Sequence, residues 1–238
     1  MSNKTLGVIG AMDSELSLLC SKLQNPVQEQ RGGLCFHVGQ LGSTRVILVK
    51  SGVGKVYAAR CTQLLIDSYH PDLVVNTGIA GGIGQGLRVG DVVIATGLVQ
   101  HDFDVTAFGY ARGNFCDHAR AEWPTIFPCD EAAIGLLDAA SASCLAPDRI
   151  HHGVVATGDV FVSSQAQKLE IAHTFHALAA EMEGGAIAQV ANANGTPVAV
   201  LRAISNLADG TAPASFDAFE QQTADLSAAI LEQLALRF

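Results

Sequence analysis

The sequence predicts an α/β protein, a three-layer α/β/α sandwich around a mixed central sheet. Short apolar runs rich in Val, Ile and Leu alternate with longer segments of helical periodicity, which is the pattern of buried strands separated by helices. A chain of 238 residues with 49% hydrophobic residues can bury a sizeable core. No stretch rich in Pro, Gly, Ser or charge divides the chain, so we expect one domain over residues 1–238.

The apolar runs predict eight strands, over Leu6–Ile9, Leu34–Val38, Arg45–Val49, Leu73–Asn76, Asp91–Ala95, Gly153–Ala156, Leu178–Met182 and Val198–Ile204. Helical patterns lie between many of them, over Asp13–Lys22, Val56–Ser68, Asp130–Ala142, Ser164–Thr174, Gly185–Asn192 and about Phe216–Leu236. The stretch Gly109–Pro128 contains Gly, Asn, Asp, Pro and aromatic residues without a sustained period. We expect a long loop there, of the kind that is often functional or part of an interface.

Composition argues against several classes of function. The net charge of −9 argues against nucleic acid as a partner, because phosphates bind to basic surfaces. No apolar run approaches the roughly 18 residues of a membrane span, and the first residues show no secretory-signal pattern, so a cytoplasmic protein is expected. The six cysteines have no paired spacing and are expected to be free thiols. No metal-binding motif occurs, and we expect neither a metal nor another cofactor.

Three segments place polar groups just past the end of an apolar run: residues 10–15, 181–185 and 202–206. In an open α/β sheet, ligands bind at the edge where the strands end. Two glycine segments also follow predicted strands, but neither identifies a ligand alone. Gly52-Val53-Gly54-Lys55 lacks the spacing of a phosphate-binding P-loop, and residues 78–82 fit a tight turn nearly as well as a ligand contact.

Seven short motifs occur in one order between residue 7 and about residue 220. They are Gly10-Ala11-Met12-x-x-Glu15, Ser51-Gly52-Val53-Gly54-Lys55-Val56, Asn76-Thr77-Gly78-x-Ala80-Gly81-Gly82, His101-Asp102-x-Asp104-Val105-Thr106-Ala107-Phe108-Gly109-Tyr110, Gly158-Asp159-x-Phe161, Glu181-Met182-Glu183 and Arg202-Ala203-Ile204-Ser205. Together they resemble the bacterial 5'-methylthioadenosine/S-adenosylhomocysteine nucleosidases. The resemblance implies the fold of the nucleoside phosphorylases and nucleosidases. It also implies hydrolysis of the N-glycosidic bond of an adenine thionucleoside, as in methionine salvage and the methyl cycle.

The resemblance also implies roles for single residues. Glu15 matches the carboxylate that holds and deprotonates the attacking water. Glu183 matches the residue that accepts the ribose 2' and 3' hydroxyls, and Met182 matches one that packs on the ribose. Phe161 matches the aromatic that stacks on the purine, and the backbone of Val162 would read the Watson–Crick edge.

The same resemblance assigns five further positions. Arg202 lies near the water in the family and either orients it or forms a structural ion pair with a carboxylate. Phe216 resembles a lid over the 5'-thio substituent, while Val105 and Phe108 resemble residues lent to the neighbouring subunit's pocket, which implies a homodimer. Ile79 stands where relatives commonly have a hydroxyl, so no hydrogen bond of that kind is expected from it.

Asn206 is the largest departure from the family pattern, since the family has an Asp there that protonates purine N7 as the glycosidic bond breaks. An Asn amide can donate a hydrogen bond but cannot deliver a proton. We therefore expect binding of the nucleoside with slow hydrolysis. Two other interpretations remain open: a 6-oxopurine nucleosidase of the futalosine hydrolase type, and a nucleoside-binding protein without catalytic activity. A phosphorylase is disfavoured, because the charge of Glu15 would repel phosphate on the nucleophile side.

Overall fold

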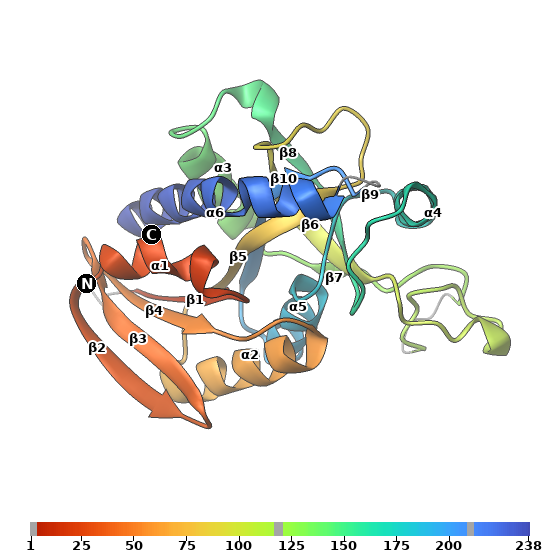
Figure 1. Ribbon diagram of the computed structural model, residues 1–238. Coiled ribbons are helices and arrows are strands. Elements are labelled where there is room, and N and C mark those ends of the chain that lie inside the picture. The colour runs from red at the N-terminus through yellow and green to blue at the C-terminus, as the bar shows by residue number, and fades with distance from the viewer. Residues whose placement is uncertain (1–3, 117–120, 209–211) are drawn as a thin grey trace.

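The strands form one ten-stranded mixed sheet with helices on both faces, which confirms the predicted three-layer α/β/α class (Figure 1). This computed structural model describes residues 4–116, 121–208 and 212–238, without the side chains of 212–217. The strands are β1 (Thr5–Gly10), β2 (Gln24–Arg31), β3 (Leu34–Leu41), β4 (Thr44–Lys50), β5 (Leu73–Gly82), β6 (Val92–Gln100), β7 (Phe127–Pro128), β8 (Ile150–Thr157), β9 (Ala177–Glu181) and β10 (Val198–Asn206). The helices are α1 (Asp13–Ser21), α2 (Lys55–Tyr69), α3 (Glu131–Ser141), α4 (Gln165–Phe175), α5 (Gly184–Ala193) and α6 (Ala212–Arg237), with 3-10 turns at η1 (Thr106–Phe108) and η2 (Pro147–Arg149).

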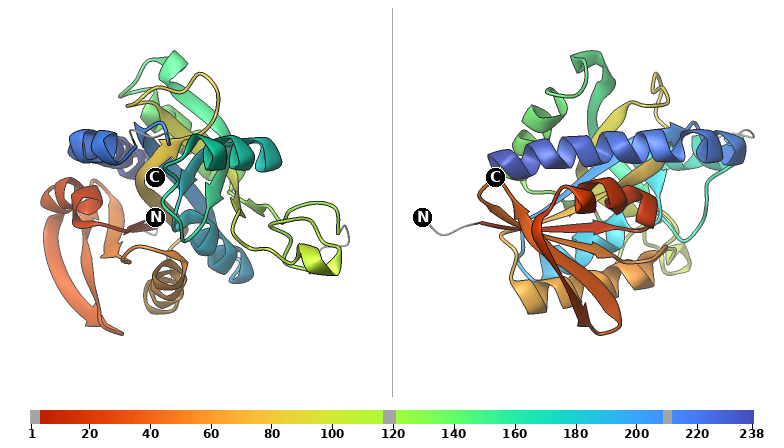
Figure 2. Two further views of the ribbon diagram at one scale, coloured as in Figure 1. Left: turned by 45° about the vertical axis from the view of Figure 1, so that its right-hand side comes forward. Right: turned by 60° about the vertical axis from the view of Figure 1, so that its left-hand side comes forward.

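The sheet separates the two larger of the three apolar cores that the described residues form. β1 is buried along its whole length, and successive side chains of a strand point to opposite faces. Val8 therefore packs in the core beneath α1, α3 and α6, whereas Ile9 packs in the core against α2 and α5. Figure 2 shows α6 lying along one face of the sheet and α2 beneath the other. Both faces of the central strands are thus covered, which explains why their sequences are apolar without alternation.

Five strands close on themselves, a detail that the sequence does not predict. β10 lies between β5 and β6, and the pairings continue through β8 and β9 back to β5. Three of these pairings contain register shifts, at residues 95–97, 154–155 and 204–206. Such irregularities bend a strand and increase its twist, which allows a sheet to curl. The carboxyl ends of the parallel strands β1, β5 and β10 meet at one edge.

Two strands were missed at the sequence level because they lack an apolar run. β2 is an edge strand whose residues are almost all exposed, and it contains Pro26, which edge strands tolerate. β7 is only two residues long and pairs with Gly97 and Leu98 of β6. It lies at the end of the predicted loop Gly109–Pro128, whose other described residues form neither helix nor strand.

All six cysteines are free thiols. Within the described ranges, no helix has the length and apolar character needed to cross a membrane.

Candidate active site

A cavity of about 200 Å³ lies at the edge where β1, β5, β9 and β10 end. All three segments in which polar groups follow an apolar run contribute to its wall, as the sequence predicts. The lining residues are Ala11, Met12, Glu15, Val53, Ile79, Ala80, Gly81, Phe161, Ala180, Glu181, Met182, Glu183, Ser205 and Asn206. A mostly apolar wall with a few convergent polar groups is typical of a site for a small organic ligand.

Glu15 lies in the first turn of α1, and its carboxylate points back toward the end of β1. Its Oε2 accepts hydrogen bonds from the N–H groups of Ala11 at 2.6 Å and Met12 at 3.1 Å, and its Oε1 accepts one from Ile79 at 3.2 Å. Burial raises the pKa of Glu15, while the charge of Arg202 and these three N–H groups oppose the rise. A held carboxylate of raised pKa is suited to take a proton from water.

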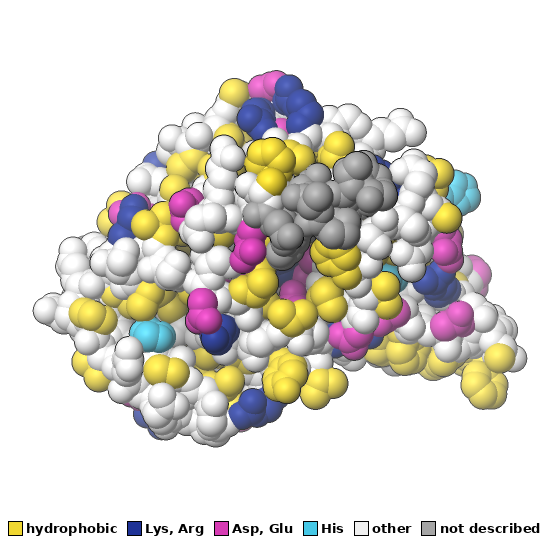
Figure 3. Space-filling model, in the orientation of Figure 1, with side chains coloured by type: hydrophobic (Ala, Val, Ile, Leu, Met, Phe, Trp, Pro, Cys, Tyr) yellow, Lys and Arg dark blue, Asp and Glu magenta, His cyan; other side chains and the backbone are white. Residues whose placement is uncertain are grey.

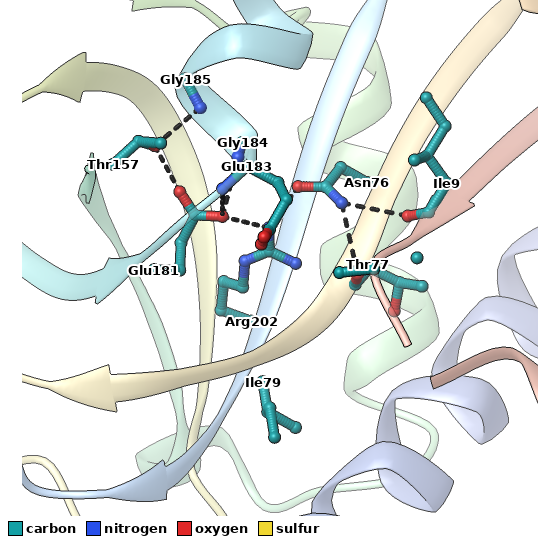
Figure 4. Close-up of polar contacts among 12 residues, drawn as sticks. Ile9, Asn76, Thr77, Ile79, Thr157, Glu181, Glu183, Gly184, Gly185 and Arg202 are labelled. Atoms are coloured by element: carbon teal, nitrogen blue, oxygen red, sulfur yellow. Dashed lines mark hydrogen bonds and ion pairs between the residues drawn. The ribbon is translucent and has the colours of Figure 1, made fainter. Parts of the chain in front are cut away.

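In the wall of the cavity, Glu181 is the centre of a buried hydrogen-bond network (Figure 4). Its carboxylate accepts hydrogen bonds from the Arg202 guanidinium and the Thr157 hydroxyl. It also accepts the backbone N–H groups of Glu183 at 3.0 Å and Gly184 at 2.7 Å, which are donors at the start of α5. Buried charges of this kind persist only when they are paired and hydrogen-bonded. The motif analysis includes Glu181 in the segment Glu181-Met182-Glu183 but assigns it no role, although a carboxylate that ends an apolar strand could have pointed to one.

Arg202 is 1% exposed and does not line the cavity. Besides Glu181, its guanidinium donates to the Asn76 side-chain oxygen. The sequence leaves two roles open for Arg202, orienting the water or forming an ion pair with a carboxylate. Its contacts in the structure are those of the ion pair. Its charge still acts on the cavity, because it opposes the rise in the pKa of both Glu15 and Glu183.

Glu183 occupies the N-cap position of α5, and its side chain lines the cavity. Its Oε1 accepts a hydrogen bond from the Gly54 N–H at 2.7 Å. Burial and the neighbouring charge of Glu181 raise the pKa of Glu183 to about 7, although Arg202 opposes this. Three acidic side chains thus surround one guanidinium, and Glu183, with its pKa raised to about 7, is the one that exchanges a proton near neutral pH.

Asn206 follows the register shift at the end of β10 and is 1% exposed. Its Oδ1 accepts the Ala208 N–H at 2.9 Å, and its Nδ2 donates to the Ser205 hydroxyl at 3.1 Å. An Asn amide carries two N–H groups, and Ser205 takes one of them. Because the oxygen is engaged by the backbone, the NH2 group is the part of this side chain that can meet a ligand.

The other predicted residues divide into those at the cavity and those outside it. Ile79, Met182 and Phe161 line the wall, and Phe161 is 43% exposed at the mouth. Val162 is buried beside Phe161 and does not line the cavity.

The residues expected to serve a neighbouring subunit lie elsewhere. Val105 and Phe108 lie on the segment around η1, away from the cavity of their own chain, and Phe108 is 80% exposed. The side chain of Phe216 lies outside the described residues.

Gly78 lies against the side chains of both Glu15 and Arg202. Its φ of +154° is rare for other residues, and a Cβ there would lie 2.5 Å from Glu15 Oε1 and 2.7 Å from Arg202 Nη1. We expect Gly78→Ala to lower the free energy of unfolding by about 1–3 kcal/mol, as overpacking does. Gly135→Ala is the matched control, since nothing lies within 4 Å of its Cβ in α3. It should raise stability by about 0.4–1 kcal/mol in the same urea titration. Equal effects of the two variants would contradict this account of Gly78.

Comparison with known proteins identifies the family. The model of the phosphorylase superfamily matches residues 5–236. A 5'-methylthioadenosine/S-adenosylhomocysteine nucleosidase of Aeromonas salmonicida is 41% identical over 230 residues, which are 95% of this chain and 96% of that protein. The chain belongs to this nucleosidase family. It is thereby a member of a family of N-glycosyl hydrolases within the phosphorylase superfamily.

Solved structures similar to this one include other nucleosidases of the family. The S-adenosylhomocysteine nucleosidase of Streptococcus pyogenes, in complex with 5-methylthiotubericidin, is 37% identical with a TM-score of 0.91, covering 100% of this chain and 98% of that one. An Asp-to-Asn mutant of the Helicobacter pylori nucleosidase, with 5'-methylthioadenosine in its active site, is 32% identical with a TM-score of 0.92 and full coverage of both chains. A futalosine hydrolase of the same organism is 31% identical with a TM-score of 0.90, covering 99% of this chain and 98% of that one.

Proposed function

We propose that this chain hydrolyses the N-glycosidic bond of 5'-methylthioadenosine and S-adenosylhomocysteine, releasing adenine and the thioribose product without a cofactor. The observation that carries the proposal is that Glu15, Glu183 and Asn206 line one mostly apolar cavity together with Phe161 and Met182. This set supplies a base for water, an acceptor for ribose hydroxyls and a donor for the purine. Membership of the nucleosidase family supports the same reaction.

In the proposed reaction, Glu15 takes a proton from a water molecule while the oxygen of that water attacks C1' of the ribose. The new C–O bond forms as the bond from C1' to the purine nitrogen breaks, and its electron pair leaves with the adenine. Glu183, as a carboxylate, accepts hydrogen bonds from both ribose hydroxyls, and its charge favours the cationic character that develops on the ribose. Phe161 stacks on the purine and Met182 packs on the ribose.

Asn206 sets the rate in this proposal. Its NH2 group donates a hydrogen bond to purine N7 but transfers no proton, so adenine leaves as an anion and takes its proton from water. Loss of a general acid slows a reaction by about 10²- to 10⁴-fold. An Asp-to-Asn mutant of the Helicobacter pylori nucleosidase holds 5'-methylthioadenosine in its active site, which supports binding of the nucleoside by an Asn-containing member of this family.

Two features of the cavity near Glu15 favour water over phosphate as the nucleophile. A phosphate would meet the carboxylate of Glu15, and like charges at close range repel strongly in a buried site. The guanidinium of Arg202, the cation nearest to that carboxylate in the cluster, is already paired with Glu181. A phosphorylase needs free donors and cations to gather an oxyanion.

The proposal predicts pH-dependent binding. The ribose hydroxyls need an ionised Glu183, whose pKa is raised to about 7, so protonation at lower pH competes with the ligand. We expect the dissociation constant of 5'-methylthioadenosine to fall about tenfold per pH unit as pH rises toward 7, and to level off above it. Isothermal titration calorimetry between about pH 5 and 8 measures this. Glu183→Gln is the control and should give a flat profile, whereas a flat profile in the unaltered chain would contradict the role of Glu183.

Two alternative functions are weighed against this one. Asn206 itself favours a 6-oxopurine nucleosidase, and the similarity to a futalosine hydrolase supports that interpretation. The same residue favours a nucleoside-binding protein without catalysis. Release of base from inosine-like substrates in preference to adenine nucleosides would favour the first alternative, and tight binding without release of either base would favour the second.

We also propose a homodimer in which the segment around η1 completes the pocket of the partner. Hydrophobic side chains gather in two places along the lower edge of the face in Figure 3, over the start of α2 and over the η1 turn. The exposed fractions are 49% for Val53, 80% for Val56, 57% for Tyr57 and 80% for Phe108. Exposed hydrophobic groups of this kind are typical of a protein interface. We expect sedimentation velocity to show a dimer that Phe108→Glu weakens. A monomer of the unaltered chain at micromolar concentration would contradict the proposal.

A further inference from the structure

The loop between β4 and α2 touches Glu183 through a single backbone group. The Gly54 N–H donates to Glu183 Oε1 at 2.7 Å. Gly54 has a φ of +100°, and a Cβ there would lie 3.1 Å from Asp159 Oδ1, so the peptide adopts a conformation that favours glycine. The direction of this one N–H therefore fixes one oxygen of the Glu183 carboxylate.

Three side chains from three separate parts of the chain hold that loop in place. The Lys55 ammonium donates to Asp102 Oδ1 at 2.6 Å, and the Lys55 N–H donates to Asp159 Oδ1 at 2.9 Å. The Asp159 N–H donates to Asp102 Oδ2 at 2.9 Å, so each of the three residues contacts the other two. We call Lys55, Asp102 and Asp159 the loop lock. It joins the start of α2 to the chain just after β6 and just after β8.

The loop lock differs from an ordinary surface ion pair. The side chains of Lys55 and Asp102 are only 19% and 22% exposed. By contrast, the Lys50–Asp13 pair has a similar distance of 2.7 Å, but its side chains are 49% and 84% exposed. Water and salt screen the attraction within a partly buried ion pair less than within an exposed one. A partly buried pair therefore holds its two side chains in place more firmly. Burial alone would raise the pKa of Asp102, but the hydrogen bonds from Lys55 and Asp159 lower it, as expected for a carboxylate that these donors keep charged.

None of the three residues of the loop lock lines the cavity, so any influence on a ligand must pass through their neighbours. Gly54 precedes Lys55 directly, and its N–H is the contact to Glu183. We propose that Lys55, Asp102 and Asp159 are positioning residues, which orient the Glu183 carboxylate toward the ribose hydroxyls by fixing the Gly54 N–H. This inference rests on the proposed function, in which Glu183 accepts those hydroxyls.

The test measures how well the protein recognises a ribose hydroxyl. Dissociation constants of 5'-methylthioadenosine and its 3'-deoxy analogue are measured by calorimetry, with all variants built on Glu15→Gln so that the ligand is not consumed. We define the hydroxyl ratio as the 3'-deoxy constant divided by the parent constant. We expect Asp102→Asn and Lys55→Met each to lower this ratio about tenfold, which corresponds to one hydrogen bond to a charged group. Binding of free adenine, which has no hydroxyl, should not change.

Matched variants separate positioning from general damage. Lys50→Met breaks the exposed pair with Asp13 and should leave the hydroxyl ratio unchanged. Lys55→Arg keeps the charge and should retain most of the ratio. If Asp102→Asn fails to fold, Lys55→Met and Lys55→Arg still test the proposal. Equal weakening of adenine and nucleoside binding would indicate a collapsed pocket and would overturn the positioning role.

Glu183→Gln separates failure of this inference from failure of the proposed function. If Glu183→Gln leaves the hydroxyl ratio unchanged, or if the nucleoside binds neither the Glu15→Gln reference nor the unaltered chain, the proposed function is wrong and the inference falls with it. If Glu183→Gln lowers the ratio but Asp102→Asn and Lys55→Met do not, the proposed function stands. The loop lock then has no positioning role.

Discussion

Asn206→Asp is expected to increase the rate of adenine release from 5'-methylthioadenosine by about 10²- to 10⁴-fold, the usual contribution of a general acid. The side chains have nearly the same shape, so the Ala208 N–H that now meets Oδ1 at 2.9 Å would keep its acceptor. The protonated carboxyl can deliver to N7 the proton that the amide cannot. The assay compares initial rates of both chains at equal enzyme concentration.

The control for this prediction is Asn194→Asp, which adds a carboxylate at an exposed position following α5. It should leave the rate unchanged. If Asn206→Asp releases adenine no faster than the unaltered chain, position 206 is not the site of a lost acid. The inosine-like substrates and the binding-only interpretation would then be tested next.

Glu15→Gln is expected to remove nearly all hydrolysis, by about 10²- to 10⁴-fold, while the nucleoside still binds. The measurement is made in the Asn206→Asp variant, where the initial rate is large enough to show the loss. Both Glu15 oxygens accept backbone N–H groups, so the new NH2 must face one of these donors. We therefore expect a moderate loss of stability as well, with the amide turned toward Ile79, whose 3.2 Å contact is the longest.

Asp13→Asn is the matched control for Glu15→Gln, because Asp13 lies in the same helical turn and its side chain is 84% exposed. It should retain the full rate. Retention of the rate by Glu15→Gln would instead remove Glu15 from the chemistry. Loss of both rate and nucleoside binding would assign it a structural role.

The fold class was predictable because the central strands of this sheet are buried on both faces and read as apolar runs. β2 escaped prediction because an exposed edge strand carries no such signal. The edge at which the cavity lies was predictable too, from the polar groups at or just after the ends of β1, β9 and β10. The pairing of Arg202 with Glu181 was not, because it depends on how β9 and β10 are brought together across the closed ring of strands. The three-residue lock on Gly54 joins elements about 50 residues apart or more, a separation that sequence patterns do not encode.

The extra residue in β10 decides which way the side chain at position 206 points, whereas the type of residue at that position decides its chemistry. Ile204 pairs with Ala80 and Asn206 with Gly81, so Ser205 has no partner of its own in β5. A strand shortened by that one residue would present position 206 to the opposite face, because side chains alternate. Insertions and deletions here would abolish the site, whereas a change of residue at position 206 leaves the frame intact. Under the proposed mechanism, a single-nucleotide change that converts Asn206 to Asp would therefore turn a slow enzyme that binds its nucleoside into a fast one, with no change in the backbone.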